Sequence, residues 1–111
     1  MTVLASGWTV PIMAGRIDSS CGNSPKLHEF APLGITGELR RLDYDTANSI
    51  RAPMMAARLK LVPASQVTYG TDDPYFRLDQ MRDLERLGLD VSDLTAVGSA
   101  NAVRLIPRLG V

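Results

Sequence analysis

The stretch QVTYGTDDPY, residues 66–75, places a short strand-forming run directly before a polar turn. Val67 and Tyr69 are residue types that favour strands. Glycine, two adjacent aspartates and a proline then end the run, as turn residues do. A charged segment with leucines at helical spacing follows. The stretch therefore predicts a strand that ends in a carboxylate-bearing turn and leads into a helix.

Outward from this strand, strands and helices are expected to alternate along most of the chain. We expect strands over 2–5, 39–46 and 66–70, and helices over 10–18, 51–62, 76–88 and 91–107. The expected helix caps are Ser6 or Thr9, then Ser49 and Ser92, with Gly88 ending the third helix. In that helix Leu78, Met81, Leu84 and Leu87 form the apolar face. This alternation indicates βαβ units and a parallel sheet.

Residues 18–37 interrupt the alternation. They contain four glycines or prolines before Gly37, so we predict one long divergent loop with at most a helical turn over 26–30. The whole chain, 1–111, is then a single segment with only three strands. A complete (β/α)₈ barrel takes about 250 residues. The predicted fold class is therefore α/β, a partial (β/α)₈ TIM barrel of roughly its last three βα units and a C-terminal helix. Such a sheet has two open edges, which predicts marginal stability or self-association.

Composition restricts the classes of function. The chain carries 12 basic and 12 acidic residues and a formal net charge of +0, which gives no electrostatic case for nucleic acid or an anionic membrane. No apolar run is long enough to span a bilayer, and the N-terminus lacks the pattern of a signal peptide. Cys21 is the single cysteine, which predicts a reducing, cytoplasmic location. We do not expect Cys21 and His28 to form a catalytic pair, because no regular element fixes their geometry.

Four stretches resemble, in the same order, the C-terminal part of the amidohydrolase-related (amidohydrolase 2) metal-dependent hydrolases and decarboxylases. They are TVPIMAGRID (9–18), LDYDTANS (42–49), VPASQVTYGTDDPY (62–75) and DLTAVGSANAVRL (93–105). The resemblance implies barrel strands seven and eight, the helix after strand six and the closing helix. It also implies an enzyme that hydrolyses or decarboxylates a small carboxylic acid of aromatic or unsaturated type.

Asp72 is the candidate site residue. The resemblance implies that this aspartate coordinates a divalent metal, most often zinc, and relays a proton in catalysis. An ionised carboxylate is a suitable zinc ligand, and a carboxylate beside metal-bound water can accept its proton. An ordinary polar turn is the alternative. Asp73 departs from the family pattern, which more often has an aromatic residue there. Asp43 and Asp45 are candidates for the same strand-end edge, for acid–base work or strand-end hydrogen bonds.

The histidine ligands that the resemblance calls for are missing from this sequence. The histidine that ends strand six in the family aligns with Ala5, and His28 matches no ligand position. A catalytic zinc needs about three protein ligands. Three interpretations stay open: a truncated enzyme that is inactive alone, a non-catalytic remnant that binds a partner or associates with itself, and an unrelated small α/β module.

Overall fold

The computed structural model describes residues 3–4, 9–21, 24–75 and 80–110. Three short parallel strands lie in the order β1 (Val3–Leu4), β2 (Asp43–Asp45) and β3 (Val67–Thr68). Val3 pairs with Asp43, and Tyr44 pairs with Val67. The predicted α/β class with a parallel sheet is therefore confirmed, although each strand is shorter than expected.

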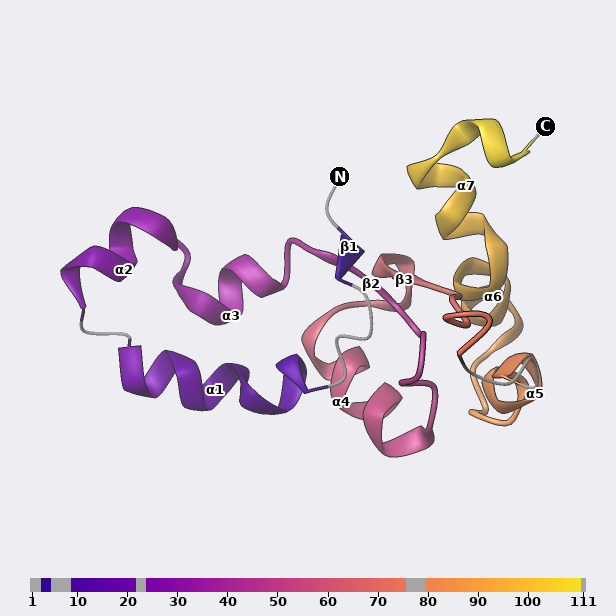
Figure 1. Cartoon of the computed structure of the whole chain (residues 1–111), viewed down its shortest axis with the longest axis horizontal. Coiled ribbons are helices and arrows are strands. Elements are labelled where there is room, and N and C mark those ends of the chain that lie inside the picture. The colour runs from indigo at the N-terminus through magenta and orange to yellow at the C-terminus, as the bar shows by residue number, and fades with distance from the viewer. Residues whose placement is uncertain (1–2, 5–8, 22–23, 76–79, 111) are drawn as a thin grey trace.

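Helices account for most of the described chain. They are α1 (Val10–Cys21), α2 (Pro25–Phe30), α3 (Gly34–Leu39), α4 (Ala52–Leu61), α5 (Gln80–Glu85), α6 (Val91–Thr95) and α7 (Asn101–Leu105). Shorter turns are the 3-10 turns η1 (Ala64–Gln66) and η3 (Pro107–Gly110) and the π-helical turn η2 (Ala96–Ala100). Figure 1 shows α1, α2 and α3 as an arm on one side of the strands, with α5, α6 and α7 on the other. No helix in the described ranges is long and apolar enough to cross a membrane.

The helical turn predicted over 26–30 is confirmed as α2. The rest of the predicted loop over 18–37 is wrong, because α1 continues to Cys21 and α3 follows α2. The carboxylate of Asp18 accepts the backbone N–H groups of Ile35 (2.7 Å) and Thr36 (3.1 Å), in the first turn of α3. Hydrogen bonds from the side chain and backbone of Thr36, together with the N–H of Ile35, lower the pKa of Asp18. Gly34, at φ +75°, starts that helix. The helix breakers in this region thus mark the ends of short helices rather than a loop.

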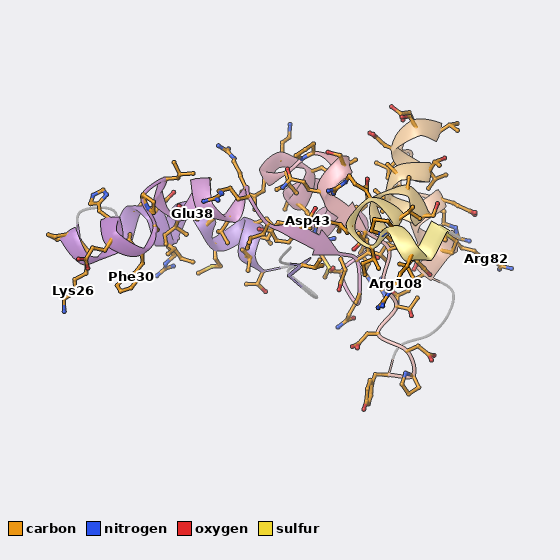
Figure 2. The ribbon with its side chains drawn as sticks, turned by 90° about the horizontal axis from the view of Figure 1, so that it is seen from above. Lys26, Phe30, Glu38, Asp43, Arg82 and Arg108 are labelled. Atoms are coloured by element: carbon orange, nitrogen blue, oxygen red, sulfur yellow. The ribbon has the colours of Figure 1, made fainter. Side chains whose placement is uncertain are left out.

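The arm buries little of its apolar surface. Neither α2 nor α3 has a buried residue. Phe30 is 82% exposed, Leu33 61% and Ile12 64%. Figure 2 shows Phe30 and Lys26 at the far end of the arm from the sheet. The arm therefore adds little to the core of the fold.

The core lies between the sheet, α4 and the C-terminal helices. Tyr44 and Val67 are fully buried in it with Met55, Leu84 and Val97. On α5 the predicted apolar face is only partly right, because Met81 is 39% exposed while Leu84 is buried. Gln80 is buried on this helix instead, so the buried face starts one residue earlier than the leucine pattern indicates. Leu78 lies outside the described residues.

Two predicted caps are also wrong. Helix α4 starts after Arg51, because the hydroxyl of Ser49 accepts a hydrogen bond from Arg58 instead of capping the helix. Helix α6 is capped by Asp90, whose carboxylate accepts the backbone N–H of Asp93 at 2.8 Å, rather than by Ser92. Gly88 does follow α5 with φ +72°, as predicted.

The outer edge of β3 is closed rather than open. Thr68 makes its ladder bonds toward β2, so the backbone groups of Val67 and Tyr69 point away from the sheet. The carbonyl of Val67 accepts the side-chain amide of Asn101 at 2.8 Å, and its N–H donates to the carbonyl of Ala64. The N–H of Tyr69 donates to the carbonyl of Val97, in the π-helical turn, at 2.9 Å. The C-terminal helical segment therefore occupies an edge that was expected to be free.

Candidate functional site

The carboxyl ends of β2 and β3 are held together by one buried threonine. The hydroxyl of Thr46 donates to the carbonyl of Gly70 and accepts its N–H, both at 3.1 Å. A Cβ atom on Gly70 would lie 3.4 Å from Cγ of Asp45. That distance is an ordinary van der Waals contact, so Gly70 and Asp45 lie side by side at the joined strand ends.

The turn after β3 carries Asp72 to an exposed position. The side-chain amide of Gln80 donates to the carbonyl of Thr71 at 2.9 Å, which ties the turn to α5. The carbonyl of Asp72 accepts the N–H of Tyr75 at 2.9 Å. Asp72 has φ +58°, a left-handed conformation that aspartate tolerates better than most residues. The sequence-predicted site residue therefore lies exposed in a turn whose backbone is fixed on both sides.

The two aspartates of β2 have separate surroundings. Asp43 starts the strand, and its carboxylate lies 3.1 Å from Nη2 of Arg104, so it does not join Asp72 at the carboxyl edge. Figure 2 shows Asp43 in the central part of the molecule. Asp45 ends the strand and accepts the N–H of Ala47 at 2.9 Å. The predicted strand-end hydrogen bond is therefore found at Asp45, and only Asp45 reaches the expected edge.

Arg58 is a buried cation that the sequence analysis did not identify. It is 0% exposed, and its guanidinium donates to the hydroxyl of Ser49 at 2.5 Å and to the sulfur of Met55 at 3.1 Å. Burial lowers the pKa of Arg58, while the negative charge of Asp45 opposes that shift. Its position three residues after Met55, on the same helix face, was the available signal. Arg58 thus stabilises the loop that follows the carboxyl end of β2.

Tyr44 is the second buried ionisable group of this region. Burial raises the pKa of its phenol, and the charge of Arg58 acts in the opposite direction. Its hydroxyl donates to the carbonyl of Leu39 at 2.8 Å. A phenol that is buried and hydrogen-bonded in this way has a structural role in the core.

The described residues do not fit a complete metal site. No group of three or more His, Cys, Asp or Glu side chains comes together within the described ranges. His28 is exposed on α2, in the arm, and Ala5 lies outside the described residues. Asp72 alone gives one carboxylate, where a catalytic zinc needs about three protein ligands. The described residues therefore supply too few ligands to hold a catalytic zinc by themselves.

The structure has the fold of part of several solved decarboxylases. It matches the crystal structure of IDCase from Metarhizium anisopliae with a TM-score of 0.77 and 20% identity, over 98% of this chain and 34% of that chain. The match to 5-carboxyvanillate decarboxylase from Sphingomonas paucimobilis has a TM-score of 0.77 and 17% identity, over 95% of this chain and 33% of that chain. The match to 2,6-dihydroxybenzoate decarboxylase from Rhizobium has a TM-score of 0.73 and 17% identity, over 97% of this chain and 35% of that chain.

These matches confirm, at the level of the fold, the resemblance that the four sequence stretches predicted. The identities are low, so they show the fold alone. The chain spans about a third of the length of these structures. No family model matches the chain. No curated protein matches its sequence either.

Proposed function

We propose that these residues form the last three βα units and closing helix of an amidohydrolase-type (β/α)₈ barrel. In that barrel Asp72 is one ligand of a divalent metal, with zinc as the expected ion, and a catalytic group. The proposed reaction is decarboxylation of a small aromatic or unsaturated carboxylic acid, with hydrolysis as the alternative chemistry. The observation that carries the proposal is the exposed carboxylate of Asp72 at the carboxyl end of a parallel strand, in a chain with this fold. Function collects at that end of barrel strands.

The remaining ligands have to come from outside these 111 residues, because His28 is the only histidine among them. We therefore propose that the 111-residue chain is inactive alone, as a truncated enzyme would be, and we expect a reducing, cytoplasmic location from its single cysteine. Isothermal titration of this chain with zinc should show no tight stoichiometric binding. Tight binding that Asp72→Asn abolishes would mean that the chain holds a complete site.

A chimaera tests the role of Asp72 directly. The matching segment of 5-carboxyvanillate decarboxylase would be replaced with this chain, and zinc affinity and decarboxylation would be measured. Asp72→Asn should weaken zinc binding by at least about tenfold, because loss of a direct ligand should cost no less than loss of an outer-shell partner. Asp73→Asn, an exposed aspartate next to it, is the matched control and should change little. Equal effects of the two substitutions in a folded chimaera would refute the assignment.

A second candidate function is a non-catalytic module that associates with itself. The exposed Phe30, Leu33 and Ile12 of the arm favour it, because apolar side chains of this size gain free energy when a second copy covers them. Sedimentation velocity should then show a dimer or larger species, and Phe30→Glu should shift it toward monomer. A chain that stays monomeric at high protein concentration would rule this candidate out.

A further inference from the structure

A surface pocket of about 520 Å³ lies between the start of α4 and the end of α5 with the turn that follows it. Its apolar wall includes Ile50, Pro53 and Leu87. Its charged lining consists of Arg51, Arg86 and Asp83. The pocket thus combines an apolar surface with two cations and one anion, which distinguishes it from a simple packing gap.

The two arginines leave the pocket with a net positive charge. The nearest guanidinium nitrogen of Arg86 lies 3.9 Å from the carboxylate of Asp83, which is longer than a hydrogen bond. The side chain of Arg51 has no ion-pair partner among the described residues. Guanidinium groups with unused N–H donors bind carboxylates well, since the two planar groups can form paired hydrogen bonds.

The backbone of α4 adds to this potential. The ten-residue helix begins at the pocket with Arg51 as its N-terminal cap, and its first turn contains no acidic residue. The N–H groups of a first helical turn have no partner within the helix and carry partial positive charge. The two arginines and the start of α4 therefore both favour a negatively charged ligand in the pocket.

The position of the pocket agrees with ligand binding. Helix α4 starts after the loop that leaves the carboxyl end of β2, and α5 follows the turn that leaves β3. Both walls thus follow the strand ends that face the Asp72 side, where ligands bind in α/β folds. Figure 1 shows α4 and α5 below the three strands in that view.

We propose that this pocket binds a small monocarboxylate with an apolar body. Its carboxylate would lie between Arg51 and Arg86, and its apolar body would lie against Pro53 and Leu87. The site needs neither a metal nor Asp72, so it goes beyond the function proposed above. An anion without an apolar body would use only half of the pocket's lining.

The test is a metal-free NMR titration of the 111-residue chain with benzoate. Arg86→Gln and Arg51→Gln should each weaken binding about tenfold, because each removes a charge-assisted hydrogen bond. Asp83→Asn should strengthen binding about twofold to fivefold, because it removes a repelling charge. Arg82→Gln is the matched control on α5 and should have no effect, since Figure 2 shows Arg82 pointing away from the molecule.

Four outcomes would overturn the proposal. The first is the absence of saturable benzoate shifts in the wild-type chain. The second is an equal loss of binding in Arg86→Gln and Arg82→Gln, and the third is inorganic phosphate binding as tightly as benzoate. Asp72→Asn should bind benzoate like the wild type, so failure of the metal proposal leaves this result unchanged. The fourth outcome that would overturn the proposal is loss of benzoate binding in Asp72→Asn.

Discussion

Arg58→Ala is expected to lower the free energy of unfolding by about 3–5 kcal/mol, a large share of the stability of a small domain. The substitution removes a fully buried side chain and leaves a cavity in the core. It also takes the hydrogen-bond donor from Ser49 and the neighbouring positive charge from Asp45. The loop after β2 loses its anchor at the same time.

Chemical denaturation followed by circular dichroism measures this effect. Arg58→Met should recover part of the loss, because methionine refills the volume without the charge. Lys60→Ala is the control on the same helix; its side chain is exposed, so the change should stay within about 0.5 kcal/mol. An alanine variant of Arg58 as stable as Lys60→Ala would show that the buried guanidinium is energetically irrelevant.

Asn101→Ala is expected to lower the free energy of unfolding by about 2–4 kcal/mol. The side-chain amide of Asn101 donates to the carbonyls of Ala64 (2.7 Å) and Val67 (2.8 Å), and all three residues are buried. Without that amide the buried carbonyl of Val67 loses its donor, and the carbonyl of Ala64 keeps only the N–H of Val67. Thermal and denaturant unfolding should both report the loss, while the exposed Ser99→Ala should leave stability unchanged.

Asn101→Asp should make the stability of the folded chain depend on pH. An ionised carboxylate beside two carbonyl oxygens is repelled, so the folded-state pKa of this aspartate should rise above its unfolded value of about 3.9. A group with a raised folded pKa binds more protons when folded, so stability falls as pH rises above the unfolded value. The variant should therefore be most stable, relative to wild type, below about pH 4. A pH-independent difference would mean that the side chain has turned to solvent.

Local signals were sufficient to predict the elements that surround the candidate turn. The strand-forming run at Val67, the turn residues after it and Gly88 all act over a few positions, and the structure confirms them. In the arm, the helix over 10–18 and the turn over 26–30 were predicted, but α3 was not, because Asp18 stabilises α3 from 17 and 18 residues away. Local breakers at Pro32 and Gly34 were therefore interpreted as loop.

The candidate site was predictable only in part, for a similar reason. The place of Asp72 after a strand follows from adjacent residues and a family resemblance. The supporting contacts from Thr46, Gln80 and Arg58 join separate elements, so no local pattern shows them. The metal-ligand role of Asp72 stays a prediction, because its partners would come from residues beyond this sequence.

The two outer edges of this sheet differ in how easily they can accept another strand, because the edge of β3 is already occupied. With Asn101 and the carbonyl of Val97 bound along that edge, a further strand could add there only by displacing the helical segment. Addition beside β1 displaces none of these contacts. Closure of the proposed eight-stranded barrel would therefore require the first barrel strand to replace the Asn101 and Val97 contacts along β3, whereas a strand that pairs with β1 would replace none of them.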